Sequence, residues 1–204
     1  MYSSMSDASM TTTEVDRVGR VIERTLPRTR YLGCLMVDSC LRALPNREDD
    51  SGNCLVFSVI NVLPSYAFRG KMGHYLLLAF KGSTVYYFDS FALPMGLYSP
   101  YLARYASECK RLGYRVISLA TRRLQATTSL VCGLYVLQAA YLIGKMGVKG
   151  FKDHIRTRYT NSYSTNDRTV VRWSYNQFPR ALPQCRLTFY SGGRPSTYIC
   201  RGMP

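Results

Sequence analysis

A polar loop that ends at a cysteine is the part of the sequence best suited to covalent chemistry. The loop runs from Gln125 to Val131, and Cys132 and Gly133 then open a strongly apolar segment that reaches Ile143. A thiol at a helix start lies at the positive end of the backbone dipoles, which favours the thiolate, the form that attacks carbonyl carbons. Gln125 lies seven positions before Cys132, so the loop can fold back and aim its amide at the same carbonyl. One loop therefore offers a candidate nucleophile and a candidate oxyanion donor.

A predicted β-hairpin supplies the base and the acid that such a nucleophile needs. His74 begins one β-rich run and Asp89 ends the next, and Lys81-Gly82-Ser83 between them indicates a tight turn. A two-residue turn at Lys81 and Gly82 would place His74 opposite Asp89, where partners on one face have Cβ atoms about 4.5–5.5 Å apart. A three-residue loop would shift the pairing by one residue.

The chemistry gives each of these residues a separate task. A free thiol with the usual pKa of about 8.5 is mostly protonated at neutral pH, and the imidazole of His74 can take its proton. The carboxylate of Asp89 can hold the ring in the required tautomer and favour its charged form. The backbone N–H of Cys132 and the amide of Gln125 can receive the negative charge that grows on the substrate oxygen.

Each residue also has an ordinary structural interpretation. Cysteine is among the most buried residue types, so Cys132 could simply belong to the core. His74 could be a satisfied core histidine, Asp89 could start a turn, and Gln125 could be solvated. The combination favours chemistry, because the second histidine, His154, lies in a basic segment where a surface role suits it better.

Cys54 is the alternative nucleophile. The apolar run from Cys54 to Leu63 is predicted to be a helix, so this thiol would also lie at a helix start. Its base would have to be His74, only twenty positions later, or the poorly placed His154. Cys132 is therefore the better candidate.

Hydrophobic periodicity predicts the other elements. Residues 1–13 are expected to be loose, and residues 47–53 and 70–73 are expected to form an exposed loop and a turn. The predicted regular elements are a helix from Glu14 to about Leu26 capped by Thr13, a strand or docking segment over 31–37, a helix over 100–112, and a strand over 114–119.

Composition places limits on the partners. The 204 residues suit one domain, 1–204, with 47% hydrophobic and 13% aromatic residues, and a formal net charge of +15 favours polyanions. From residue 149 to 201, ten Lys and Arg outnumber two acids and alternate with aromatic residues. This pattern is typical of nucleic-acid surfaces, although a packed aromatic layer with a charged rim explains it equally well. The candidate nucleic-acid-binding residues are Lys149, Lys152, Arg156, Arg158, Arg168 and Arg172.

The cysteines and the apolar runs predict neither a metal nor a membrane. Seven cysteines without C-x-x-C spacing argue against zinc and fit a reducing compartment. We expect no secretory signal, because no basic-then-apolar leader is found. The longest apolar run, residues 130–143, is shorter than the roughly 20 residues of a membrane helix.

In order and spacing, these residues resemble the adenovirus-type cysteine proteases, the adenains, and their relatives that cut SUMO and ubiquitin-like proteins. The order of histidine, acid and cysteine excludes the papain arrangement. The resemblance is most specific from residue 54 to 144, and Cys54 to Asn61 resembles the helix that precedes the family's catalytic histidine. The matching motifs are His74-Tyr-Leu-Leu-Leu-Ala-Phe, Tyr87-Phe-Asp89-Ser-Phe-Ala and Gln125-x₆-Cys132-Gly133.

The resemblance implies a fold and a set of roles. Cys132 would be the nucleophile, His74 the general base, Asp89 its orienting acid and Gln125 the oxyanion donor. The fold would be α+β, with a central mixed or antiparallel sheet and the Cys132 helix packed inside against it. The expected protein is a monomeric endopeptidase of the host nucleus and virion, which cleaves virion structural and core precursors, with DNA and a viral peptide as activators.

Three departures from the adenain pattern point to another DNA virus with an adenovirus-like assembly module. Adenains have Glu at the position of Asp89, whereas the SUMO-specific relatives have Asp, as this chain does. Tyr75 replaces the Trp that usually follows the catalytic histidine, which weakens a cation–π contact with that histidine. Val116 stands where we expect the cysteine that pairs with the peptide, although Cys109 lies nearby. The alternatives are a deubiquitinase or SUMO-removing protease, and a DNA-binding virion protein with a dead protease fold.

Overall fold

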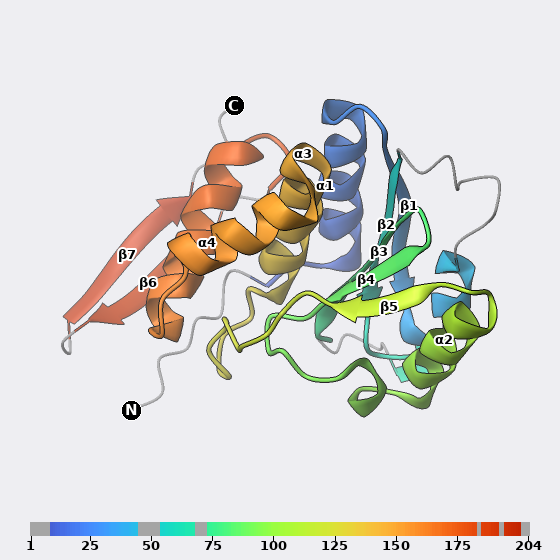
Figure 1. Cartoon of the computed structure of the whole chain (residues 1–204). Helices are drawn as coiled ribbons and strands as arrows, with labels where there is room; N and C mark the ends of the chain where they lie inside the picture. Colours follow the sequence, from blue (N-terminus) through green and yellow to red (C-terminus); the bar gives the residue numbers. More distant parts are fainter. Residues whose placement is uncertain (1–8, 45–53, 68–72, 183–184, 192–193, 201–204) are drawn as a thin grey trace.

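A computed structural model describes residues 9–44, 54–67 and 73–182, together with the backbone of two further strands (Figure 1). In chain order its elements are α1 (Thr12–Thr25), β1 (Thr29–Met36), η1 (Val37–Ala43), β2 (Leu55–Asn61), η3 (Ser65–Ala67), β3 (Tyr75–Lys81), β4 (Thr84–Phe88), η4 (Met95–Leu97), α2 (Pro100–Arg111), β5 (Arg115–Ser118), α3 (Cys132–Arg158), α4 (Tyr163–Gln177), β6 (Cys185–Ser191) and β7 (Arg194–Cys200).

A mixed five-stranded sheet forms the centre of the molecule. Its strand order is β1-β2-β3-β4-β5, with parallel outer pairs and antiparallel inner pairs. Helices α1 and α3 cover one face and α2 covers the other, while β6 and β7 form a separate hairpin beyond α4 (Figure 1). The predicted α+β fold with a central mixed sheet is confirmed.

Both faces of the sheet are buried, and β3 shows this most clearly. Leu77 and Ala79 belong to the core on the α3 side, whereas Leu76, Leu78 and Phe80 belong to the core on the α2 side. Successive side chains of a strand point to opposite faces, so a strand covered on both sides reads as a continuous apolar run.

The same effect explains why β2 was wrongly predicted to be a helix. All seven residues from Leu55 to Asn61 are buried, so the strand lacks the alternation that marks a strand with one exposed face. Periodicity cannot separate such a strand from a buried helix. Cys54 consequently precedes a strand and lacks the helix start on which its candidacy as nucleophile depended.

The N-terminal helix begins earlier than predicted. The cap is Thr11 and not Thr13, because Thr11 and Glu14 form a reciprocal capping box. Met10 is also buried, against Gly133, so the predicted looseness does not extend through residue 13. Residues 1–8, the predicted loop 47–53 and most of the predicted turn 70–73 lie outside the described residues.

Helix α3 carries the cysteine at its first position, as predicted. Residues 132–143 are buried on every side, because the sheet, α1 and α4 all pack around them. Gly147, at φ +74°, bends the chain, and the helix then continues to Arg158 with a mostly exposed polar face. No helix in the described part of the chain is both long and apolar enough to cross a membrane.

Candidate active site

The hairpin brings His74 and Asp89 together, although not in the predicted register. The two-residue turn consists of Gly82 and Ser83, with Lys81 paired to Thr84. Gly82 has φ +53°, as the first position of a type II′ hairpin turn requires. The pairing therefore differs by two residues from the prediction. His74 directly precedes β3 and Asp89 directly follows β4, so the two residues meet just beyond the paired strands.

A short hydrogen bond joins the two side chains. The Nε2 atom of His74 lies 2.7 Å from Oδ1 of Asp89. The side chain of Asp89 is completely buried and that of His74 is 12% exposed. The contact predicted for these two residues is thus present.

Asp89 is held by more than the histidine. Its carboxylate accepts hydrogen bonds from the backbone N–H groups of Phe91 (3.0 Å) and Leu93 (2.9 Å) and from the hydroxyl of Tyr98 (2.8 Å). Burial raises the pKa of Asp89, but the hydrogen bonds from His74 and from the backbone outweigh burial and bring that pKa below its usual value. The carboxylate is therefore a fixed negative charge behind the imidazole.

Two aromatic rings fix the plane of the imidazole. Phe91 stacks on His74 at a centroid distance of 4.7 Å, and Tyr98 stacks at 5.4 Å. Sequence reasoning missed both residues, because the turn after Asp89 carries no pattern that shows its path. Tyr75, which was expected to contact the imidazole, instead buries its ring and donates its hydroxyl to the backbone carbonyl of Met10.

Cys132 lies close enough to the imidazole to change its pKa. Burial lowers the pKa of His74. The hydrogen bond with Asp89 and the nearby Cys132 sulfur raise this pKa by more than burial lowers it, to a net value of about 9. Because Nε2 is engaged by Asp89, Nδ1 is the ring nitrogen left to exchange a proton with the sulfur. The imidazole is therefore mostly charged at neutral pH, next to a thiol at a helix start.

Gln125 is fully buried, which excludes the solvated alternative. Its side-chain oxygen accepts a hydrogen bond from Ser90 (2.6 Å), and its side-chain nitrogen donates to the backbone oxygen of Ser129 (2.7 Å). Among the described residues, the second N–H of that amide has no acceptor. Ser90 follows Asp89 directly, so this hydrogen bond joins the acid's turn to the loop that leads to Cys132.

Asp167 of α4 supports the same loop and was not singled out from the sequence. It accepts hydrogen bonds from the hydroxyl of Tyr135 (3.0 Å) and the backbone N–H of Ala126 (3.4 Å). Burial raises the pKa of Asp167 to about 6. The signal that could have revealed it is helical spacing, since Asp167 shares a buried stripe with Val170, Val171 and Ser174.

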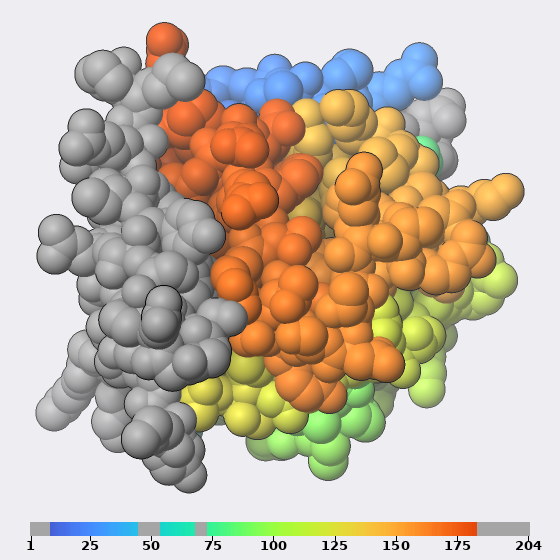
Figure 2. Space-filling model, turned by 90° about the vertical axis from the view of Figure 1, so that its left-hand side faces the viewer, coloured from blue at the N-terminus to red at the C-terminus, as the bar shows by residue number. Residues whose placement is uncertain are grey.

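The predicted nucleic-acid-binding residues fall into two groups. Lys149, Lys152 and Arg156 line one hollow of the surface, and Arg158, Arg168 and Arg172 line another. Figure 2 faces this part of the molecule, where α4 and the second half of α3 lie side by side. No residue described above in the His74 site lines either hollow.

Cys109 is the cysteine nearest to Val116, where the resemblance places a peptide-pairing cysteine. Cys109 is completely buried in α2, so it could pair with an external peptide only after exposure. Among the described residues, no group of three or more His, Cys, Asp or Glu side chains is arranged to hold a metal ion.

Comparison with known proteins gives distant structural similarities. No family model matches the sequence, and no curated protein matches it. The SUMO protease Ulp1, with its catalytic cysteine oxidised to a sulfinic acid, matches with a TM-score of 0.48 and 16% identity, covering 86% of this chain and 80% of that chain. The Ulp1 protease domain in complex with Smt3, the yeast orthologue of SUMO, matches with a TM-score of 0.44 and 16% identity, over 72% and 76% of the two chains. The Chlamydia trachomatis effector protein Cdu1 bound to ubiquitin matches with a TM-score of 0.44 and 14% identity, over 89% and 86%.

Proposed function

We propose that this chain is a cysteine endopeptidase with Cys132 as its nucleophile. The observation that carries the proposal is the hydrogen bond of 2.7 Å between His74 and Asp89, with Cys132 beside the same imidazole at the start of a buried helix. A nucleophile, a base and a group that orients the base are the three parts of thiol-dependent acyl transfer.

The proposed reaction proceeds in two halves. The Cys132 thiolate attacks the scissile carbonyl carbon, and the backbone N–H of Cys132 and the amide of Gln125 stabilise the resulting oxyanion. The charged imidazole of His74 gives its proton to the leaving amine as the C–N bond breaks, which leaves a thioester on the sulfur. His74 then takes a proton from water and the resulting hydroxide attacks the thioester. The C–S bond breaks, the carboxylic acid leaves, and the Cys132 thiolate beside a charged His74 is restored.

The first test compares two cysteines of the chain. Cys132→Ala should abolish peptide cleavage and the rapid labelling of the site thiol by a cysteine-directed electrophile at neutral pH. Cys54→Ala is the control, since Cys54 is a partly exposed thiol next to an apolar element but lies outside the proposed site. Full cleavage by the Cys132→Ala variant would contradict the assignment. Rapid labelling of Cys132 would also exclude a dead protease fold.

Ubiquitin-like proteins are the first substrate class that we propose. The acid that orients His74 is aspartate, the residue that the SUMO-specific relatives carry in the resembling motif, and its short side chain reaches the imidazole here. Incubation with fluorogenic ubiquitin and SUMO conjugates tests this choice. Cleavage that is lost in Cys132→Ala would support it, and an active enzyme that ignores both conjugates would contradict it.

Maturation of virion precursor proteins is the second candidate. It rests on the resemblance of the His74, Asp89, Gln125 and Cys132 motifs to the adenains, and it carries with it a nuclear and virion location and activation by DNA or a viral peptide. Incubation with the structural precursors of the source virus, with and without DNA, separates the two candidates. A virion protease should cut the precursors and leave ubiquitin and SUMO conjugates intact.

A further inference from the structure

A concave pocket between the end of α3 and α4 is lined by hydrogen-bond donors and positive charge. Its volume is about 570 Å³, within the usual range of small-molecule sites. Arg158 comes from the last turn of α3, while Arg168 and Arg172 come from α4. Among the described residues, the pocket lining includes no Asp or Glu. Three guanidinium groups thus surround one hollow, with no carboxylate among its described lining residues.

Helical spacing explains how α4 presents this surface. The residues of α4 that line the pocket are separated by three or four positions, so they lie along one face of the helix. They are Thr165, Arg168, Thr169, Arg172, Trp173 and Asn176. The opposite stripe of α4 is the buried one that carries Asp167.

Two buried polar atoms in the pocket have no hydrogen-bond partner among the described residues. Gln138 is only 1% exposed, and its side-chain oxygen accepts from the hydroxyl of Tyr159, yet its Nε2 bonds to nothing described. Nε2 of His154 is likewise buried and has no hydrogen-bond partner among the described residues. A buried amide without an acceptor is destabilising, so such a group marks a place where an acceptor from outside the protein would be stabilising.

Two of the pocket's arginines, Arg158 and Arg172, are not engaged by acids of the described part of the chain. Among the described residues, neither Arg158 nor Arg172 has a carboxylate within ion-pair distance, and both are exposed. The neighbouring hollow is different, because it contains Asp153, which pairs with Arg156 at 3.0 Å. None of its lining residues carries a buried polar atom without a partner. The two basic hollows are therefore not equivalent.

We propose that the pocket of Arg158, Arg168, Arg172 and Gln138 binds a small polyphosphate anion. Phosphate oxygens accept hydrogen bonds from guanidinium forks and from amide N–H groups, which are the groups present here. Three arginines match several negative charges better than one, and the volume exceeds the needs of a single phosphate. This site is separate from the His74 site, and its test does not depend on peptidase activity.

The probe for this proposal is inorganic tripolyphosphate, titrated into the full chain by isothermal calorimetry. The chain contains one tryptophan, Trp173, and it lines the pocket, so its fluorescence reports where the anion binds. We expect saturable binding of one tripolyphosphate per chain, with a change in tryptophan emission that follows the same curve.

Two variants with the same loss of charge make the test specific. Arg172→Gln removes a guanidinium from the pocket and should weaken tripolyphosphate binding by about tenfold to a hundredfold. Lys152→Gln removes an equally exposed positive charge from the neighbouring hollow and should leave the affinity within about twofold. Gln138→Met should also weaken binding, and its melting temperature shows whether the fold has survived.

Three results would overturn the proposal. The first is the absence of saturable heat with the wild-type chain. The second is an equal loss of affinity in Arg172→Gln and Lys152→Gln, which would mean diffuse charge rather than a built pocket. The third is binding of a duplex DNA oligomer without binding of tripolyphosphate, which would mean an extended nucleic-acid surface.

Discussion

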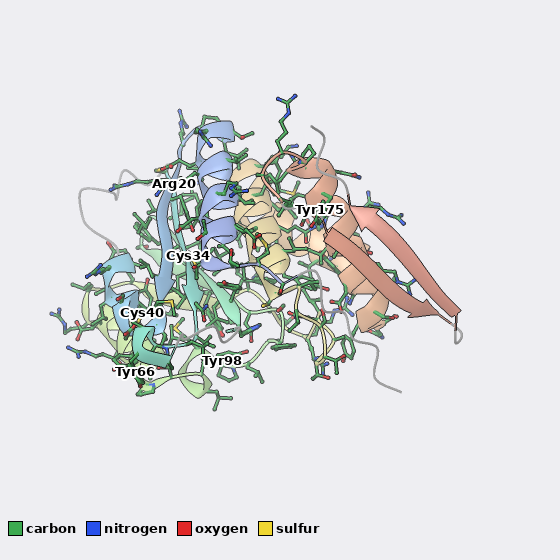
Figure 3. All side chains as sticks on the ribbon, turned by 180° about the vertical axis from the view of Figure 1, so that it is seen from behind. Arg20, Cys34, Cys40, Tyr66, Tyr98 and Tyr175 are labelled. Atoms are coloured by element: carbon green, nitrogen blue, oxygen red, sulfur yellow. The ribbon has the colours of Figure 1, made fainter. Side chains whose placement is uncertain are left out.

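At the scale of single residues, the site depends on opposing effects on one imidazole. Burial alone would make His74 neutral, because a charged group loses solvation in the interior. The carboxylate of Asp89, fixed by two backbone N–H groups and by Tyr98, reverses this together with the Cys132 sulfur, so the pKa of His74 is raised to about 9. Tyr98, labelled in Figure 3, comes from the segment below the sheet in that view, so the support for the imidazole lies outside the hairpin.

This raised pKa predicts the alkaline limit of the proposed activity. The imidazole must be protonated to give a proton to the leaving amine, so kcat/KM should fall as the pH rises through about 9. Asp89→Asn removes the charge that favours imidazolium, so the fall should begin at lower pH in that variant. The measurement is kcat/KM against pH with a substrate that the wild type cleaves.

The control for this profile is Cys54→Ala, which should keep the wild-type limit. A descending limb at the same pH in wild type and Asp89→Asn would contradict the role of Asp89 as the group that raises the pKa of His74.

At the scale of elements, helix α4 holds the loop that carries Gln125. Asn166 donates to the backbone oxygen of Leu124 (3.1 Å), and Asp167 accepts from Ala126 and from Tyr135 of α3. The loop between β5 and α3 is therefore anchored from a helix that follows it in the chain. Asp167 is fully buried, so ionisation of its carboxyl group lowers the free energy of unfolding.

The raised pKa of Asp167 predicts how stability changes with pH. In the folded state this carboxyl holds its proton up to about pH 6, whereas an unfolded aspartate releases it near 3.8. The stabilising contribution of this group is thus complete below about pH 3.8 and is lost as the pH rises through 6. At about 1.4 kcal/mol per pKa unit, the loss is about 3 kcal/mol.

Asp167→Asn removes this titration. The free energy of unfolding of the wild type, relative to that of the variant, should fall by about 2 kcal/mol between pH 4 and 7 in denaturant titrations. Asp153→Asn is the control, because Asp153 is a partly exposed acid of α3. A difference between wild type and Asp167→Asn that stays constant with pH would show that Asp167 is not a strained buried acid.

At the scale of the whole molecule, the basic hollows and the His74 site lie in different regions. The His74 site lies at the ends of the inner strands of the sheet, whereas the two basic hollows lie on the second half of α3 and on α4. Tyr98, beside His74, and Tyr175, on α4, lie well apart in Figure 3. A net charge of +15 and two basic hollows support the proposal that the chain associates with DNA.

This DNA association should depend steeply on salt. If the six predicted cations each neutralise a phosphate, the logarithm of affinity should fall with the logarithm of salt with a slope of about −5. Lys149→Gln should reduce the slope by about one, and affinity should fall equally for unrelated DNA sequences. Binding that is absent at low salt, or that does not change with salt, would reject the association.

The sequence by itself determined the residues and the types of most elements. The β-rich runs that begin at His74 and end at Asp89, with a turn signal between them, were sufficient to predict the contact between these two residues. The polar loop before Cys132 and the long apolar run after it favoured this cysteine over Cys54. These signals are local, because caps, turns and periodicity act over a few residues. The prediction of a helix at β2 was wrong for the same reason, because burial of both faces of the strand removes the alternation that identifies a strand.

Only the tertiary structure decided what surrounds those residues. The stacking of Phe91 and Tyr98 on His74, the bond between Ser90 and Gln125, and the anchoring of the loop by Asp167 all join segments that are separate in the chain or linked by irregular turns. The unsatisfied amide of Gln138 is visible only once α4 packs beside α3. Burial and desolvation are properties of the packed molecule, so the raised pKa of His74 and that of Asp167 follow from the fold and not from residue type.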